Sequence, residues 1–216
     1  QRRLHILHLT TEEECDFLRT LPREHHISTE VCPQHLVLTS PECYEHLGTK
    51  AQMNPPIRTK RHTVALWQAL KDGIIDCIAT DHAPHTLAEK KQPYGMSPSG
   101  MPGVETSLAL MLDRVNRDLC TLPEVVYWMS ESPAKLYKMH GKGRIEVGQD
   151  ADLALIDMSL KKKVTNGKLH TRVNWSPFDG MEMQGWPVRT IVNGQTVFLN
   201  GEVNESVRGK EICFAS

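Results

Sequence analysis

The sequence predicts an α/β protein in which a parallel sheet, or part of a barrel, precedes a smaller β region. Short apolar runs rich in β-branched residues alternate with amphipathic helical patterns over the first two thirds of the chain. Acids and histidines stand where these runs end. After Gly141 the chain becomes turn-rich and contains the pairs Asn193-Gly194 and Asn200-Gly201, which are typical of tight turns. We therefore expect two parts, residues 1–140 and residues 141–216.

The first elements expected are a strand over Arg3–Leu9, a helix that runs to about Leu21 and a strand over Ile27–Val31. Thr11 and Glu14 have the spacing of a capping box, which places the start of that helix. Two apolar strands separated by a helix are typical of a parallel sheet.

A short helix is expected near Glu42–Leu47, with Ser40 as its cap and Pro41 as its first residue. The apolar spacing over Lys60–Asp72 predicts a longer helix, which Gly73 closes.

The run Ile74–Thr80 is apolar enough to be a strand covered on both faces, and it ends in Asp81, His82 and His85. In parallel α/β folds the residues just past the carboxyl ends of strands build the active site. The alternative is an ordinary strand-to-helix loop, in which Asp81 caps the next helix and the histidines are solvated.

Thr86–Gly103 is expected to be a long loop of the kind that forms lids or binding sites. Helices should follow at Glu105–Asn116, Pro123–Met129 and Ala134–Met139.

The last third should contain a strand at Leu153–Ile156 and a hairpin of Val188–Val192 with Thr196–Leu199. Asn193-Gly194 predicts a type I′ turn between the two hairpin strands, and Asn200-Gly201 predicts another turn.

Composition excludes several classes of protein. The net charge of −1 gives no field that favours nucleic acid or an anionic membrane, and no apolar stretch has the length of a transmembrane helix. The six cysteines lack CxxC spacing, so neither a zinc knuckle nor a redox pair is indicated. Isolated cysteines fit a reducing compartment, and we expect a cytoplasmic protein.

His8 ends the first predicted strand, and Asp81 ends a strand two further along the sheet. Imidazole and carboxylate together suit zinc or a similar divalent ion. Zinc lowers the pKa of bound water to about 7, and a neighbouring carboxylate can pass the proton to a leaving nitrogen. Asp81 is the best candidate for that transfer. A lone strand-end histidine is more often structural, so the case for His8 depends on its pairing with Asp81.

Five motifs stand in order along the chain, at Glu30–Leu36, Met53–Arg58, Ala79–Thr86, Gly100–Thr106 and Gly143–Asp152. In residues and order they resemble the motifs of dihydroorotases, which belong to the cyclic-amide branch of the amidohydrolase superfamily. The resemblance extends from about Leu4 to Val203.

The resemblance implies a (β/α)₈ metallo-dependent hydrolase barrel with a small β-sandwich. This chain would hold about strands six to eight of the barrel and a portion of the sandwich. His8 and Asp81 would be metal ligands, with Asp81 also acting as the proton shuttle, and the complete enzyme would bind two zinc ions.

The resemblance also implies that Asn54 and His85 hold the substrate, and that Pro102 and Gly103 offer backbone hydrogen bonds to its ring. The reaction would be the reversible cyclisation of N-carbamoyl-L-aspartate to dihydroorotate in pyrimidine biosynthesis. We expect His82, His35 and Glu30 to orient other groups rather than to bind metal.

Other interpretations stay open. Cys32-Pro33-Gln34 is more similar to dihydropyrimidinases, whereas the asparagine of Asn54-Pro55 and the final histidine His85 favour dihydroorotase over allantoinase or hydantoinase. A non-catalytic dihydroorotase-like module, kept for assembly with another enzyme of the pathway, is a further alternative.

The family's His-x-His pair is absent from this sequence, and 216 residues fall below the roughly 250 of a complete barrel. We expect the chain to be the C-terminal half of a protein whose first half is missing from this sequence, was cleaved away, or lies on another chain. It should then be inactive alone, bind zinc weakly, and need that half in cis or in trans. Open sheet edges also predict a homo-oligomer.

Overall fold

The computed structural model describes residues 2–22 and 26–215. The chain forms two compact units, each built from two stretches of sequence. The first unit contains Gln1–Ser107 and Lys163–Met181, and the second contains Leu108–Lys162 and Glu182–Ser216. The domain boundary expected after residue 140 remains a prediction.

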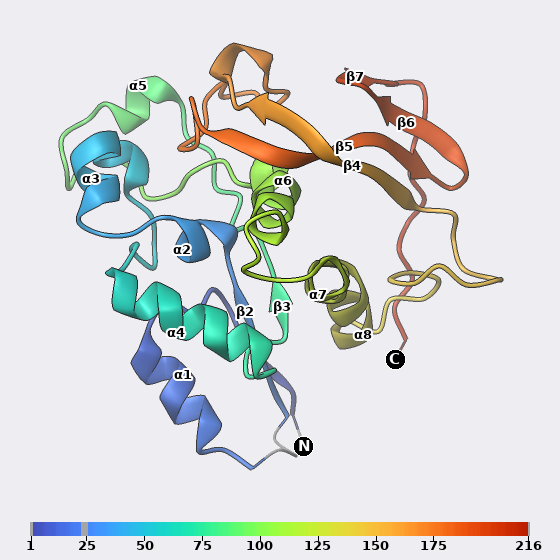
Figure 1. Cartoon of the computed structure of the whole chain (residues 1–216), viewed down its shortest axis with the longest axis horizontal. Helices are drawn as coiled ribbons and strands as arrows, with labels where there is room; N and C mark the ends of the chain where they lie inside the picture. Colours follow the sequence, from blue (N-terminus) through green and yellow to red (C-terminus); the bar gives the residue numbers. More distant parts are fainter. Residues whose placement is uncertain (1, 23–25, 216) are drawn as a thin grey trace. The chain divides into compact units, whose positions relative to one another are not determined.

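The sheet of the first unit has three parallel strands in the order β1-β2-β3 (Figure 1). The strands are β1 (Leu4–Ile6), β2 (Ile27–Val31) and β3 (Cys77–Ile78). This arrangement confirms the parallel sheet expected from the alternation of strands and helices.

The third strand is shorter than the Ile74–Thr80 run predicted. The backbone N–H groups of Ile74 and Ile75 both donate to the carbonyl of Ala69, at 2.9 and 3.1 Å, so these residues still belong to the turn that ends the preceding helix. Thr80 lies beyond the paired residues. Apolar character alone therefore overestimated the length of this strand.

Two helices of the first unit, α1 and α4, run side by side (Figure 1). The unit also contains a 3₁₀ turn, η1. Thr11 and Glu14 form the predicted capping box. Pro41 is the N-cap of α3 rather than its first residue, which corrects the role expected of Ser40 and Pro41. The bounds are α1 (Glu12–Arg19), α2 (Pro33–Val37), α3 (Glu42–Leu47), η1 (Gly48–Ala51), α4 (Lys60–Lys71) and α5 (Leu87–Lys90).

Within the stretch predicted to be a loop, Thr86–Gly103, the structure has a short helix, α5. Thr86 and Glu89 form a capping box that starts it, with the Thr86 Oγ1 accepting from the Glu89 N–H at 3.3 Å. The sequence pattern did not predict this helix, because so short an element leaves no apolar period to detect.

The next helices are α6 (Val104–Val115), α7 (Leu122–Val126) and α8 (Ser132–Leu136), with a π-helical turn, η2 (Tyr127–Glu131), between the last two. The predicted helix over Glu105–Asn116 is thus confirmed to within one residue at each end.

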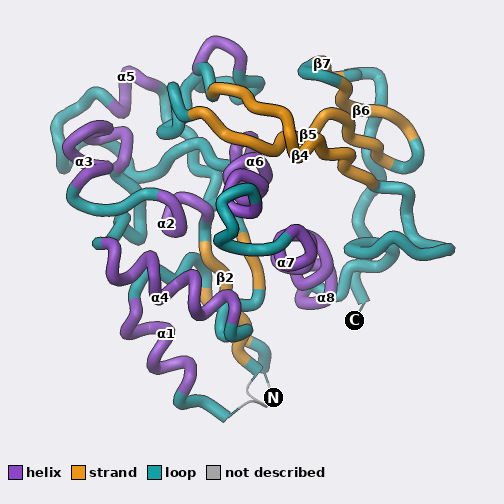
Figure 2. Tube along the Cα trace, in the orientation of Figure 1, coloured by secondary structure: helices purple, strands orange, loops and turns teal. Residues whose placement is uncertain are grey.

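The remaining strands form a four-stranded sheet in the order β4-β5-β6-β7 (Figure 2). Asn193 and Gly194 join β5 to β6 with φ angles of 49° and 77°, as the predicted type I′ turn requires. Asn200-Gly201 forms a second tight turn, also at positive φ. The bounds are β4 (Leu153–Lys163), β5 (Glu182–Val192), β6 (Gln195–Leu199) and β7 (Glu202–Val203), and η3 (Asn166–Lys168) is a 3₁₀ turn in the first unit.

One buried cluster in the first unit holds together segments that lie far apart in the sequence. Its core residues are Cys43, Ala51, Met53, Ile57, Met101 and Trp175. All six cysteines of the chain are free thiols. In the part of the chain that the structure describes, no helix has the length and apolarity needed to cross a membrane.

Candidate active site

The two candidate metal ligands follow the outer strands of the three-stranded sheet. His8 lies two residues after β1, and Asp81 lies three residues after β3. Both residues have a left-handed backbone, with φ of 37° and 42°. This conformation is uncommon for residues other than glycine, and such strain is concentrated at functional sites. The strand ends therefore fix an unusual backbone at the two positions singled out from the sequence.

The Nδ1 atom of His8 is buried and has no hydrogen-bond partner among residues 2–22 and 26–215. A buried ring nitrogen that makes no bond costs roughly 1–3 kcal/mol. A lone pair in that position could bind a metal ion, and His8 fits the role of a ligand on this ground.

Both candidate ligands act on the residues that follow β2, the strand between them. Burial is the main cause that raises the pKa of the Cys32 thiol, and the charge of Asp81 raises it further. Burial lowers the pKa of His35 to about 4; the hydrogen bond to Pro55 opposes this shift, and the charge of His8 adds to it. His8 and Asp81 are thus each close enough to the residues after β2 to influence their titration.

His82 positions the segment that holds Gly103. Its Nδ1 accepts hydrogen bonds from the backbone N–H groups of Gly103 at 3.1 Å and Val104 at 3.3 Å. A Cβ atom on Gly103 would lie 2.8 Å from the carbonyl oxygen of Thr80, the residue before Asp81. Only glycine allows this close approach, which brings the predicted ring-binding backbone beside the predicted ligand.

His85 is fixed at two points. Its ring Nε2 lies 3.0 Å from the carbonyl oxygen of Ser99. Its backbone carbonyl accepts a hydrogen bond from the indole N–H of Trp175 at 2.7 Å. A substrate contact by the His85 ring would therefore use Nδ1.

Asn54 has an exposed side chain on a loop whose backbone is well supported. Met53 before it is buried in the core cluster, and the carbonyl of Pro55 after it accepts from His35 Nε2 at 3.1 Å. Asn54–Pro55 is a cis peptide. The supported backbone presents a polar side chain outward, as a substrate contact requires.

Several site-supporting residues were missed by sequence reasoning. Gln34 Nε2 donates to the carbonyl of Thr80 at 2.8 Å, and Gln52 Nε2 donates to that of Ser97 at 2.8 Å. Lys90 is fully buried, although it lies in the stretch that was expected to be a long loop. All three act on backbone carbonyls far along the chain, and no residue pattern marks such contacts.

A second group of possible ligands lies within the sheet itself. One ligand atom from each of His5, Glu30 and Cys77 falls within 4.8 Å of the other two. His5 already bonds Ser28 Oγ at 2.8 Å through Nδ1 and Glu30 Oε2 at 3.0 Å through Nε2. Burial raises the pKa of the Cys77 thiol to about 12. Protein hydrogen bonds therefore account for this group without an ion, and the role of Glu30 as a supporting residue stays a prediction.

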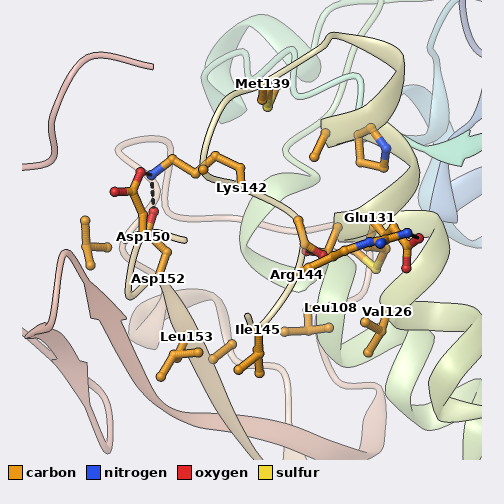
Figure 3. Close-up of a pocket in the computed structure, with 18 of the residues that line it drawn as sticks. Leu108, Val126, Glu131, Met139, Lys142, Arg144, Ile145, Asp150, Asp152 and Leu153 are labelled. Carbon is orange, nitrogen blue, oxygen red and sulfur yellow. Dashed lines mark hydrogen bonds and ion pairs between the residues drawn. The ribbon is translucent and has the colours of Figure 1, made fainter. Parts of the chain in front are cut away.

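A cavity of about 1060 Å³ lies in the second unit, and none of the six predicted site residues lines it. Figure 3 shows apolar side chains on one side, with Lys142 paired to Asp150 and Asp152 on another. Since it lacks the predicted ligands, this cavity is separate from the candidate active site.

A parallel α/β sheet with acids and histidines just after its strand ends is typical of α/β enzymes, which bind their ligands at that edge of the sheet. Residues 5–197 match the model of the Amidohydrolase family. The chain belongs to that family.

The chain is similar to a dihydroorotase of Anaplasma phagocytophilum (strain HZ), with 36% identity over 90% of this chain and 43% of that protein. Among solved structures it is similar to the L-hydantoinase (dihydropyrimidinase) of Arthrobacter aurescens, with 33% identity and a TM-score of 0.89 over 94% of this chain and 46% of the other. It also shares its fold with an inactive dihydroorotase-like domain of a CAD-like multifunctional protein from Chaetomium thermophilum, with 22% identity and a TM-score of 0.70 over 94% of this chain and 53% of that one. The chain spans about half the length of the curated relatives it matches.

Proposed function

We propose that this chain is the C-terminal part of a dihydroorotase, comprising about strands six to eight of a (β/α)₈ barrel and a portion of a β-sandwich. The observation that carries the proposal is the pair of strained residues, His8 and Asp81, after the strands that flank β2. The similarity to dihydroorotases along nine tenths of the chain supports the choice of reaction. The complete enzyme would interconvert N-carbamoyl-L-aspartate and dihydroorotate.

His8 and Asp81 would hold zinc, of which the complete enzyme would bind two ions. The unpartnered Nδ1 of His8 supports this assignment. Zinc at this position would supply Lewis acidity and lower the pKa of bound water to about 7. Two side chains are too few for a two-metal centre, so the other ligands would come from a first half of the protein, in cis or in trans.

Asp81 would take the proton of the attacking water and deliver it to the ring nitrogen as the amide bond breaks. Ring closure would use the same transfer in reverse. Asn54 and His85 would hold the substrate, with His85 near its carboxylate. The backbone of Pro102 and Gly103 would bind the ring, and His82 would hold this segment in place by accepting from the Gly103 N–H at 3.1 Å.

A second candidate is a dihydropyrimidinase or hydantoinase, which cleaves related cyclic amides. The similarity to the Arthrobacter aurescens enzyme and the sequence Cys32-Pro33-Gln34 favour it. A carboxylated ring substrate distinguishes the two, because only a dihydroorotase needs a contact for that carboxylate.

The test is reconstitution with the N-terminal half of the parent protein. The chain alone should show no ring opening, and the mixed halves should open dihydroorotate in preference to dihydrouracil, which lacks the carboxylate. Preference for dihydrouracil would favour the second candidate, and no turnover of either ring would favour a non-catalytic module.

Asp81→Asn should abolish the recovered activity, because the amide cannot accept the proton. Asp118→Asn is a matched control, since Asp118 also has a left-handed backbone, with φ of 58°, but lies in the second unit. Unchanged turnover in the Asp81 variant would remove this residue as the proton shuttle.

A further inference from the structure

Lys90, the last residue of α5, is the most deeply buried charge in the described part of the first unit, with 0% of its surface exposed. Its Nζ donates to the carbonyls of Gln52 at 2.9 Å and Pro98 at 2.8 Å. Burial lowers the pKa of its ammonium, and no carboxylate pairs with it among residues 2–22 and 26–215. Removing an ammonium from water without a counter-ion is costly, so the presence of a lysine at this buried position calls for an explanation.

The two carbonyls belong to different loops, and the same loops are joined by further bonds. The Gly100 N–H also donates to the Gln52 carbonyl, at 2.9 Å. Thr49 Oγ1 donates to the carbonyl of Lys90 itself. One buried ammonium therefore lies where the loop after η1, the end of α5 and the segment Pro98–Gly100 meet.

Each of these loops leads directly to a residue proposed to hold the substrate. Gln52 lies two residues before Asn54, and Pro98 lies four residues before Pro102. Ser99, next to Pro98, accepts the hydrogen bond from His85. Lys90 thus acts on the backbone that carries all of the proposed substrate contacts, while His8 and Asp81 are placed by the sheet.

We propose that Lys90 is a positioning residue that fixes the loops of Asn54, His85 and Pro102-Gly103 in one arrangement, so that they bind the ring and its carboxylate together. A methionine side chain could fill the same space, but it has no N–H or O–H group and could not hold two carbonyl oxygens from two loops. The proposal rests on the proposed function for the identity of the substrate, but not for the arrangement of the loops.

The first measurement is amide hydrogen exchange on the 216-residue chain carrying Lys90→Met, with Lys91→Met as the control at an exposed neighbouring lysine. Exchange at Ser99 and Gly100 should become about tenfold faster in Lys90→Met and stay unchanged in the control, because the loops open locally. Equal rates in the two variants would overturn the proposal.

The second measurement is steady-state kinetics of the reconstituted enzyme with dihydroorotate. Lys90→Met should raise KM about tenfold and leave kcat within about twofold. The substrate contacts would loosen, whereas the proposed metal ligands, His8 and Asp81, would stay in place. A lower kcat at unchanged KM is the result of a smaller folded fraction and would overturn the proposal.

If Lys90→Met does not fold, Thr49→Val provides the same comparison, because it removes only the hydroxyl that bonds the Lys90 carbonyl. We expect about a threefold rise in KM and in the amide exchange rate at Gly100. If both KM and this exchange rate stay unchanged, the proposal is overturned. If the unmodified halves together turn over no cyclic amide, the proposed function fails, and the exchange measurement still decides the role of Lys90.

Discussion

Gly100 occupies a position at which a side chain has no room. Its φ is 129°, and an added Cβ would lie 2.5 Å from the carbonyl oxygen of Ala83 and 2.8 Å from the Cβ of Ala83. The contact joins the Asp81–His85 segment to the loop that carries Pro102 and Gly103. The structure thus needs glycine here both for the backbone angle and for the close approach.

Gly100→Ala should lower the free energy of unfolding by about 2–4 kcal/mol, as strain and overlap add together. Gly95→Ala separates the two causes, since Gly95 has a φ of 90° with nothing within 4 Å of its added Cβ, and it should cost only about 1 kcal/mol. Urea unfolding of both variants measures the difference. If the two variants lost the same free energy of unfolding, the close approach to Ala83 would make no contribution to stability.

His35 makes stability depend on pH. Its pKa is lowered from the ordinary 6.5 to about 4, mainly by burial, so the folded chain resists a proton that the unfolded chain accepts. The stability contribution is therefore present above pH 6.5 and is lost as the pH falls from about 6.5 to about 4. The loss amounts to at most about 3 kcal/mol.

Urea unfolding at pH 7.5 and pH 4.5, with a chelator present, should show this loss. His35→Gln removes the titrating group, so the variant should lose about 2 kcal/mol less than the unmodified chain between the two pH values. The same pH dependence in both chains would assign the effect to other groups.

Among elements, α6 is joined to the segment that holds Trp175 through one carboxylate. Glu105 Oε1 and Oε2 accept from the backbone N–H of His170 at 2.9 and 3.0 Å, and Oε2 also accepts from that of Thr171 at 3.0 Å. Hydrogen bonds to a charged acceptor contribute about 1.5–3 kcal/mol. We expect Glu105→Ala to lower the free energy of unfolding by about 2 kcal/mol.

Glu105→Gln keeps one oxygen acceptor and should lose about half as much in the same thermal or urea unfolding measurement. If the glutamine variant were as unstable as the alanine variant, the charge rather than the hydrogen-bond geometry would carry the contribution.

Elements were predictable from sequence where a local pattern determined them. The capping box at Thr11 and the Asn193-Gly194 turn need only a few neighbouring residues, and both are confirmed. The start of β3 and the existence of α5 were missed, because the turn that holds Ile74 and Ile75 and the short helix capped by Thr86 leave no apolar period to detect. The same division holds for the site: strand ends pointed to His8 and Asp81, whereas the buried ammonium that supports their neighbours has no local signature.

At the scale of the whole molecule, the three-stranded sheet has two edges. In the described residues β1 pairs only with β2, and β3 also pairs only with β2. Leu4 and Leu7, in and just after β1, are 55% and 54% exposed. An open parallel edge beside exposed apolar side chains favours pairing with another chain.

We expect the chain to self-associate in a concentration-dependent way, which sedimentation velocity measures directly. Replacing Leu4 and Leu7 together with lysine should shift the chain towards the monomer, because lysine opposes pairing at a strand edge. Val147→Lys charges an equally apolar position in the second unit and should leave the association unchanged. Monomers at every concentration of the unmodified chain would contradict this expectation.

The bond from the Trp175 indole to the His85 carbonyl spans ninety residues of sequence. Because the first unit is built from Gln1–Ser107 and Lys163–Met181, it cannot close while the ribosome has made only its first stretch. The whole of the second unit's first stretch, Leu108–Lys162, must be synthesised before Trp175 emerges to fill the core beside Met53 and Met101. The order of synthesis therefore places completion of the candidate site late, and a chain that stalled before residue 175 would expose an unfinished core to chaperones and proteases.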